Sequence, residues 1–353
     1  MGETLHLAPN KGMPLAARSP RPGGPLPREE RRMQKHLSAA GARPAARIIT
    51  LAVALAMLIA ACQSSSTGQS SSPPSTRYPL TIQESNGSTV TIAQRPVRIV
   101  SLSPSATEML FAINAGPQVI AVDEQSNFPS TAPVTKLSGF TPNVEAIAAY
   151  RPDLVVAADD TGGLVHALSV LGIPTLIEPA ARNLDDSYAQ VEQLGEATSR
   201  QSEAQGLVKQ MRSQITAAVA TITKPSRRLK VYHELDDTYY SATSKTFIGQ
   251  VYALLGLANI ADVATGAASD YPQLSSEYIV SSSPDLIVLA DTKCCHQSAS
   301  TVAARPGWGS IAAVRSGQVI GVDDDVASRW GPRVVDFLVA VATHVRQLEA
   351  INA

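Results

Sequence analysis

The chain has 353 residues, of which 44% are hydrophobic and 17% charged, and this composition supports a folded core in two or three domains. The net charge of −1 is unevenly divided, because residues 1–61 hold nine of the 29 basic but only three of the 30 acidic side chains. The acidic remainder argues against nucleic acid as a partner, since phosphate binding needs a basic surface. The sequence contains none of the common motifs for phosphate-binding loops, dinucleotide binding, zinc proteases or serine hydrolases, which disfavours those enzyme classes.

The first element is an apolar run of fourteen residues, Ile48–Ala61, which follows Arg43 and Arg47 and is too short to cross a bilayer as a helix. A basic flank, a short apolar segment and small residues are typical of a secretory signal. The run leads into Ile59-Ala60-Ala61-Cys62, which resembles a bacterial lipobox and implies that Cys62 is acylated. We therefore expect an extracytoplasmic protein that a lipid anchors to the outer face of the cell membrane. An ordinary signal peptide with an incidental cysteine is the alternative.

Within the leader 1–61, we expect the signal peptide at 33–61, because Met33 opens a more typical leader than the Pro/Arg/Gly-rich stretch before it. Residues 62–77 are rich in Ser, Pro, Thr and Gln, a composition that predicts a flexible tether. A hairpin is then expected over Tyr78–Ala93, where apolar and polar residues alternate around Asn86-Gly87.

From Val97 onward, short apolar strands alternate with helical stretches, which indicates βαβ crossovers and mostly parallel sheets. The first half contains expected strands at Val97–Leu102, Val119–Val122, Asp153–Ala157 and Thr175–Ile177, and expected helices at Pro104–Asn114, Asn143–Tyr150 and Gly162–Leu171. The second half contains expected strands at Leu229–Glu234, Asp285–Leu289 and Val319–Val322, and expected helices at Thr246–Leu255, Ser276–Ser282 and Pro332–Glu349.

Between the halves, Thr198 and Gln201 form a predicted capping box, and a helix follows to about Ile222 with apolar residues at three- and four-residue steps. The fold class is therefore α/β, with two Rossmann-like α/β lobes at 78–198 and 226–353 joined by a single long helix within 199–225. One helix does not hinge widely, so we expect only a small closure on a ligand.

The two halves also share a repeat. Residues 145–159 and 277–291 are identical at eight of fifteen positions, among them a leading Glu and a trailing Asp. A helix–Pro–Asp–strand junction is common, but it requires neither of those two acidic residues. We infer that the two lobes are homologous.

The segment from Arg98 to Glu108, which reads RIVSLSPSATE, resembles the opening segment of the iron-siderophore and vitamin B12 binding proteins of ABC importers. The stretches Glu145–Val156 and Leu171–Pro174 resemble the same family, and the resemblance covers about residues 78–350. It implies a class III solute-binding protein, which is not an enzyme and needs no cofactor of its own. It further implies that a metal chelate is captured between the lobes and delivered to an ABC permease dimer with its ATPase. We expect a monomer.

Ligands of open α/β sheets bind beyond the carboxyl ends of the strands. In both lobes these ends carry polar and aromatic residues that would face each other across the cleft, and Tyr239, Tyr240 and Trp330 suit a flat or bulky ligand. Arg329 would pair either with an anionic group of the ligand or with the neighbouring Asp residues. The predicted ligand-binding residues are Ser103, Pro104, Ser105, Asp123, Phe128, Asp160, Thr161, Asp236, Tyr239, Tyr240, Cys294, Cys295, Arg329 and Trp330.

The predicted loops hold many carboxylates, which would repel an anionic ferric catecholate but tolerate an amide-rich corrin or a neutral or cationic hydroxamate complex. We favour cobalamin or another corrinoid, with a ferric siderophore or haem as alternatives. Two more distant alternatives are a metal or thiol enzyme built on Cys294-Cys295-His296 and a receptor for bare metal ions that uses His166, His233 and His296. No metal site is predicted.

Two further predictions concern single residue pairs. With Cys62 acylated, Cys294 and Cys295 would be either two free thiols or a disulfide between neighbours. Glu145 and Glu277 occupy equivalent positions of the repeat, and an acidic residue at a helix start stabilises the helix by about 0.3–1 kcal/mol. In the family that the chain resembles, one glutamate of each lobe docks onto the permease, and the resemblance assigns this role to Glu145 and Glu277.

Overall fold

The computed structural model describes residues 76–352 except 86, 224–226 and 264–268, so the predicted leader, Cys62 and most of the tether lie outside the described residues. Within the described part of the chain, no helix is both long and apolar enough to cross a membrane. The first described element is the predicted hairpin, in which strands β1 (Leu80–Gln83) and β2 (Thr89–Ile92) pair antiparallel.

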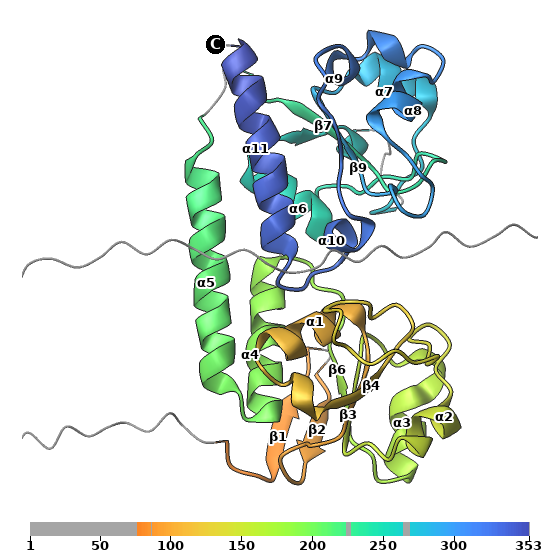
Figure 1. Cartoon of the computed structure of the whole chain (residues 1–353), viewed down its shortest axis with the longest axis vertical. Helices are drawn as coiled ribbons and strands as arrows, with labels where there is room; N and C mark the ends of the chain where they lie inside the picture. Colours follow the sequence, from red (N-terminus) through yellow and green to blue (C-terminus); the bar gives the residue numbers. More distant parts are fainter. Residues whose placement is uncertain (1–75, 86, 224–226, 264–268, 353) are drawn as a thin grey trace, which may run out of the picture. The chain divides into compact units, whose positions relative to one another are not determined.

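The N-terminal lobe is built on a parallel sheet of four strands in the order β4-β3-β5-β6, as the alternation of strands and helices predicts (Figure 1). All four strands of this sheet are fully or largely buried, which explains their mostly apolar sequences. The elements of this lobe are β3 (Ile99–Leu102), α1 (Pro104–Ala112), β4 (Val119–Val122), α2 (Val144–Ala149), β5 (Leu154–Ala157), α3 (Leu164–Val170), β6 (Thr175–Ile177) and α4 (Leu184–Thr198).

The C-terminal lobe repeats this architecture with a parallel sheet in the order β10-β9-β7-β8, which is the same order of equivalent strands when read from β8. Additional helices follow β9 and β10. The elements of this lobe are β7 (Lys230–Glu234), α6 (Phe247–Leu254), β8 (Ala258–Asn259), α7 (Ser276–Ser282), β9 (Leu286–Leu289), α8 (Ala299–Ala303), α9 (Ala312–Arg315), β10 (Val319–Gly321), α10 (Asp324–Ser328) and α11 (Val334–Asn352).

The sequence repeat corresponds to the same junction in both lobes. The carboxylate of Asp153 accepts hydrogen bonds from the backbone N–H groups of Val97 and Arg98, at 2.9 Å each. In the other lobe, the carboxylate of Asp285 accepts from the backbone N–H of Lys230 at 2.8 Å. The aspartate of each Pro-Asp-Leu segment therefore fixes the start of the neighbouring strand, which gives this part of the repeat a physical cause.

Helix α5 (Gln201–Ala220) connects the lobes, and it lies beside α4 in one half and α11 in the other (Figure 1). Its 20 residues correspond to about 30 Å of helix. The predicted capping box was wrong: Thr198 belongs to α4, its hydroxyl donates to the carbonyl of Leu194, and Ser199 turns the chain with a φ of 57°. Sequence analysis missed α4 because two helices separated by one tight turn look like a single helical stretch.

The buried carboxyl group of Glu84 bonds the edge strand of the N-terminal sheet. Glu84 follows β1, and its Oε1 accepts from the backbone N–H of Ile177 at 2.6 Å, which ties the hairpin to β6. Glu178, the next residue, is also buried. Burial, together with the nearby Glu84, raises the pKa of Glu178 well above its usual value.

This raised pKa predicts how stability depends on pH. A carboxyl group with a raised folded-state pKa stabilises the fold below its unfolded-state pKa, and this contribution is lost as pH rises through the folded-state value. We expect Glu178→Gln to increase the free energy of unfolding at pH 8 by on the order of 1 kcal/mol and to have little effect at pH 4. Denaturant titrations at both pH values measure this. The exposed Glu192→Gln is the matched control, and an equal effect of Glu178→Gln at both pH values would contradict the assignment.

Candidate functional site

The carboxyl ends of the parallel strands carry the predicted ligand-binding residues, but the structure assigns several of them to the fold. Ser103 caps α1, since its hydroxyl accepts from the backbone N–H of Ala106 at 3.3 Å, and Pro104 is the first residue of that helix. Ser103 and Ser105 are both buried. These serines were predicted to meet the ligand, but their hydroxyls hold helix and lobe contacts instead.

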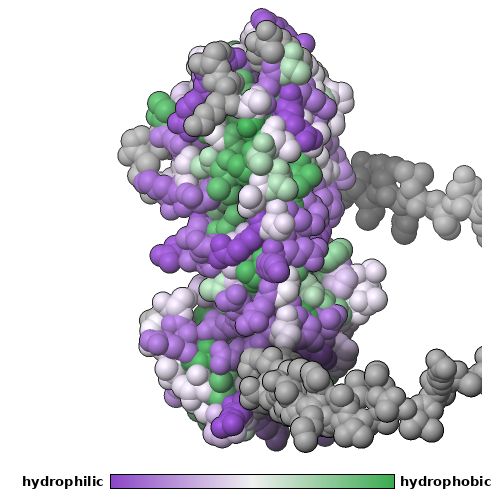
Figure 2. Space-filling view, turned by 90° about the vertical axis from the view of Figure 1, so that its left-hand side faces the viewer, coloured by the Kyte–Doolittle hydropathy of each residue, from purple (hydrophilic) through white to green (hydrophobic). Residues whose placement is uncertain are grey.

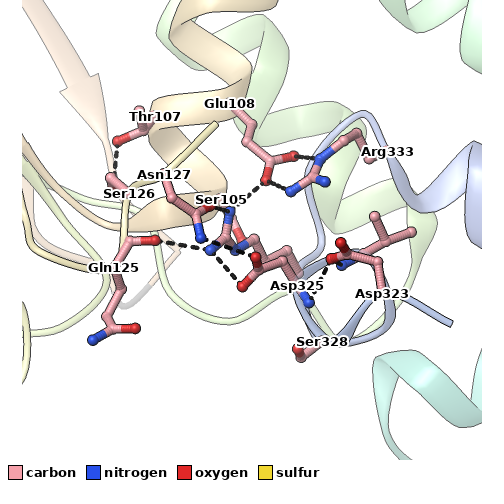
Figure 3. A network of polar contacts seen from close by, with 12 residues as sticks. Ser105, Thr107, Glu108, Gln125, Ser126, Asn127, Asp323, Asp325, Ser328 and Arg333 are labelled. Atoms are coloured by element: carbon pink, nitrogen blue, oxygen red, sulfur yellow. Dashed lines mark hydrogen bonds and ion pairs between the residues drawn. The ribbon is translucent and has the colours of Figure 1, made fainter. Parts of the chain in front are cut away.

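An ion-pair cluster around Glu108 joins the two lobes, and Glu108 lies in α1 and is 2% exposed. Arg329, after α10, donates to Glu108 at 2.9 Å, and Arg333, before α11, donates to it through Nε at 3.0 Å. Figure 3 shows Glu108 of the N-terminal lobe facing Arg333 of the C-terminal lobe. Gly331 makes room for this cluster, because a Cβ there would lie 3.1 Å from Glu108 Oε2.

Arg329 is fully engaged in this contact. Its guanidinium also donates to the side chain of Asn127 at 3.0 Å, to the carbonyl of Gln125 at 2.8 Å and to the carboxylate of Asp325 at 2.8 Å (Figure 3). Asn127 in turn donates to Asp325 at 2.9 Å. The alternative prediction, that Arg329 pairs with the neighbouring Asp residues, is met by Asp325, and a contact of Arg329 with a ligand stays a prediction.

Trp330 makes the second part of the lobe contact. Its indole N–H donates to Gln190 of α4 at 2.8 Å, and its backbone N–H donates to the hydroxyl of Ser105 at 3.3 Å. The hydroxyl of Ser187 donates to the Trp330 carbonyl at 2.6 Å. Trp330 and Ser105 thus hold the lobes together rather than presenting a free surface. We call Arg329, Trp330 and Arg333, with their partners Glu108, Asn127 and Gln190, the interlobe latch.

Exposed aromatic side chains lie in the loops at the strand ends of both lobes. Phe128 and Phe140 come from the loop after β4, and Tyr240 and Tyr271 come from two paired segments of the C-terminal lobe. Phe140, which is 77% exposed, follows Gly139, where a Cβ would lie 2.5 Å from the carbonyl oxygen at the end of β3. Sequence analysis named Phe128 and Tyr240 but missed Phe140 and Tyr271; the glycine before Phe140 was the signal available.

Tyr239 differs from its exposed neighbour. Its ring lies 5.5 Å from the buried ring of Trp308, and the guanidinium of Arg305 lies over Trp308 at 4.5 Å. Arg305 also forms a bidentate pair with the buried Glu234, with both distances 2.6 Å. Tyr239 therefore packs partly into the C-terminal lobe, and only Tyr240 of this pair is exposed.

Most of the predicted carboxylates already have partners. Asp323 and Asp325 pair with Lys293 at 2.7 and 2.9 Å, while Asp123 is buried beneath the strand ends, and burial raises its pKa. Asp236 accepts from the N–H and hydroxyl of Thr238 in its own turn. Burial and the adjacent Glu234 raise the pKa of Asp291 to about 7. The charge argument against anionic ligands is accordingly weaker than the sequence suggested.

A third strand-end loop, after β5, is exposed, and its conformation is stabilised by hydrogen bonds within the loop. Asp160 accepts from the backbone N–H of Val165 at 2.7 Å, and Thr161 donates to Asp159. Gly162 and Gly163 both have positive φ angles, of 67° and 72°, which only glycine adopts readily. Asp160 and Thr161 thus remain accessible candidates.

The cysteines and histidines relate to two alternatives from the sequence, the disulfide between neighbouring cysteines and the receptor for bare metal ions. Cys294 and Cys295 are free cysteines, so the disulfide between neighbours is not formed in the structure. His233 is fully buried, its Nδ1 lies 2.6 Å from the Tyr252 hydroxyl, and burial lowers its pKa to about 3, which makes it a neutral core residue. No group of three or more metal-ligating side chains occurs among the described residues.

Glu145 and Glu277 occupy equivalent exposed places, each in the first turn of a helix, α2 and α7. Asn143 and Ser275 cap these helices in the same way, by accepting from the N–H three residues on. Both helices lie on the side of Figure 1 away from α5.

Figure 2, with the α5 side facing the viewer, shows hydrophilic side chains across the middle of the molecule and a hydrophobic area above them.

Comparison with known proteins decides the family. A family model described as periplasmic binding protein matches residues 99–326. The chain belongs to the periplasmic binding protein family. The class III fold of this family, two α/β lobes joined by a helix, is the fold described above, and the predicted resemblance is confirmed.

Two curated relatives are 30% and 31% identical to this chain. An uncharacterized ABC transporter substrate-binding lipoprotein, YvrC, of Bacillus subtilis is 31% identical over 76% of this chain and 86% of the relative. A cobalamin-binding protein of Halobacterium salinarum is 30% identical over 75% of this chain and 73% of the relative.

Solved structures share the fold at lower identity. The periplasmic vitamin B12 binding protein BtuF of Vibrio cholerae superposes with a TM-score of 0.62 at 24% identity, over 72% of this chain and 99% of that one. The periplasmic heme binding protein HutB of the same species superposes with a TM-score of 0.63 at 22% identity, over 70% of this chain and 98% of that one. At these identities the likeness concerns the fold.

The interlobe latch of this periplasmic binding protein can be tested by removing its central charge. Glu108→Gln removes the carboxylate that pairs with the buried Arg329 and the half-buried Arg333, and breaking a buried pair costs about 3–5 kcal/mol. We expect the free energy of unfolding to fall by about 3 kcal/mol in urea titrations. Glu124→Gln, at an exposed position, is the control; equal stability of the two variants would remove Glu108 from its assigned role.

Proposed function

We propose that the protein is the extracytoplasmic solute-binding lipoprotein of an ABC importer, and that it captures cobalamin or another corrinoid between its lobes for delivery to the permease. The observation that carries the ligand proposal is the set of exposed aromatic side chains at the strand ends of both lobes. It is supported by the name of the cobalamin-binding relative and, for the transport class, by the name of the Bacillus lipoprotein. The proposal includes no catalytic role, since those relatives are named as binding proteins.

The aromatic residues suit this ligand because a corrin is a broad, flat macrocycle with an apolar face and an amide-rich edge. Phe140 offers a face for apolar contact, and Phe128 offers the face that is not covered by the Arg333 guanidinium, which lies 4.2 Å from its ring. Tyr240 and Tyr271 add a hydroxyl that can bond an amide. The exposed carboxylates of Asp159 and Asp160 are acceptors for amide N–H groups. Each of these groups is on the surface before ligand binds, so the site needs little rearrangement.

Haem is the second candidate, and one observation favours it. Tyr240 and Tyr271 are exposed phenols at the same strand ends, and a tyrosine can serve as an axial ligand of haem iron. The fold likeness to the heme-binding protein of Vibrio cholerae is compatible with this ligand. A ferric hydroxamate siderophore remains the third member of the class.

The experiment that separates these ligands is a titration of the purified protein with cobalamin, haemin and a ferric hydroxamate, followed by visible absorption and tryptophan fluorescence. We expect saturable binding of cobalamin. Phe140→Ala and Tyr240→Ala should each weaken it by about tenfold, equivalent to 1.4 kcal/mol of lost aromatic contact. Val134→Ala, at a 99% exposed position of the loop that carries Phe140, should bind as the unsubstituted protein does.

Two outcomes would contradict this scheme in different ways. Binding of haemin or the ferric hydroxamate in place of cobalamin would replace the ligand but retain the transport class. Binding of none of the three would contradict the metal-chelate proposal itself. Lipidation at Cys62 is proposed on the lipobox, and it would keep the protein on the outer face of the membrane near its permease.

For the permease contact, we propose that Glu145 and Glu277 dock onto basic residues of the two permease subunits. Their equivalent places on two homologous lobes would match a two-fold symmetric partner. The double variant Glu145→Ala/Glu277→Ala should lose permease binding and uptake while its ligand affinity stays unchanged. Glu192→Ala, at an exposed glutamate of α4, is the control. Loss of ligand affinity with intact permease binding would instead place these glutamates in the ligand site.

A further inference from the structure

The turn that follows β9 carries two adjacent thiols at the strand-end side of the C-terminal lobe. Cys294 is exposed and Cys295, the next residue, is half-buried. The next residue, His296, has a φ of 56°, a left-handed conformation that is uncommon outside glycine. The pair is therefore accessible and lies in a tightly turned piece of backbone.

The backbone of this turn is held by one carboxylate of α10. The N–H groups of Lys293 and Cys294 donate to Asp324 at 3.1 and 3.0 Å, and the Thr292 hydroxyl donates to it at 2.9 Å. From the other side, the N–H of Cys295 donates to the Asp291 carbonyl at 3.2 Å. The N–H of Cys294 is thus one of the groups that hold the turn to α10, and the N–H of Cys295 closes the turn itself.

Helix α10 connects the turn to the interlobe latch. Asp325, next to Asp324, accepts from Lys293 Nζ at 2.9 Å, from Asn127 at 2.9 Å and from Arg329 at 2.8 Å. Figure 3 shows Asp325 among the latch residues. Hydrogen bonds therefore connect the backbone N–H groups of Lys293 and Cys294 to Asp324 of α10, and Asp325 of the same helix to the N-terminal lobe.

We propose that Cys294 and Cys295 form a thiol–disulfide modification site whose oxidation loosens the interlobe latch. The co-reactant is a low-molecular-weight disulfide: one thiolate attacks it, forms a mixed disulfide and releases one thiol, and the second cysteine then displaces the other. Two protein thiols become one disulfide, and the small disulfide is reduced to two thiols. The site does not depend on which ligand the protein transports.

Geometry explains why this oxidation reaches the latch. Consecutive Cα atoms are about 3.8 Å apart across a trans peptide, whereas disulfides usually join Cα atoms about 4.4–6.8 Å apart. Closing the ring must therefore distort the peptide between the two cysteines, together with the N–H groups that bond Asp324 and Asp291. The strain makes the disulfide easy to reduce, which is the property of a reversible site rather than a structural one.

The test uses purified protein treated with oxidised glutathione, followed by mass analysis of the peptide that carries both cysteines. We expect this peptide to lose two hydrogen atoms. The chain has two tryptophans, and Trp308 is fully buried, so acrylamide quenching reports chiefly on Trp330 in the latch. Quenching should rise on oxidation and return to its starting value with dithiothreitol.

Two variants make the test decisive. Cys294→Ser should neither form the disulfide nor change its quenching under the same treatment. Asp324→Asn should still oxidise, but its Trp330 quenching should no longer respond. Glutathione adducts without a Cys294–Cys295 disulfide would contradict the proposed disulfide site. A Cys294–Cys295 disulfide that leaves Trp330 quenching unchanged would contradict the proposed connection between this site and the latch.

Discussion

The arrangement of the two lobes depends on one buried carboxylate. Glu108 lies at the first helix of the N-terminal lobe, where water cannot solvate its charge, and a carboxylate in such a place is costly unless cations and hydrogen bonds compensate it. Both compensating cations, Arg329 and Arg333, come from the C-terminal lobe. Separating the lobes would leave Glu108 without both cations, Arg333 without its carboxylate, and Arg329 with Asp325 alone. The latch is thereby a second connection between the lobes, in addition to helix α5. The latch and the helix together limit how far the lobes can move apart.

The two sheets are built by the same rule. In each lobe, an aspartate at the start of one strand accepts backbone N–H groups at the start of its neighbour, so the registers of the paired strands are fixed at the same place. Parallel sheets of this kind gather their loops at the carboxyl ends. Duplication therefore creates two opposed sets of loops from one pattern, and the sequences of those loops are free to differ. That freedom is visible in the C-terminal lobe, where only the loop after β9 carries thiols.

The surface that remains for a ligand is smaller and less charged than the strand-end sequences suggest. Arg305 pairs with Glu234, Lys293 pairs with both Asp323 and Asp325, and Asp123 is buried. The exposed groups include the aromatic side chains, of which Phe140 is the most exposed, and the carboxylates of Asp159 and Asp160. Recognition would then depend on the shape and apolar face of the chelate more than on its net charge. This is consistent with one fold serving proteins that are named for vitamin B12 and for heme.

The sequence by itself determined the α/β class, the succession of strands and helices along the chain, the repeat and the family. These depend on local periodicity and on short motifs such as RIVSLSPSATE. It also placed Glu145 and Glu277 at equivalent helix starts. Only the tertiary structure decided the contacts of Arg329 and Trp330, since their partners Glu108, Ser105 and Gln190 lie more than a hundred residues away in the chain. A charged or aromatic residue at a strand end looks the same in sequence whether it meets a ligand or the opposite lobe. Only the packing of the two lobes shows which carboxylates are neutralised and which aromatic rings are left exposed.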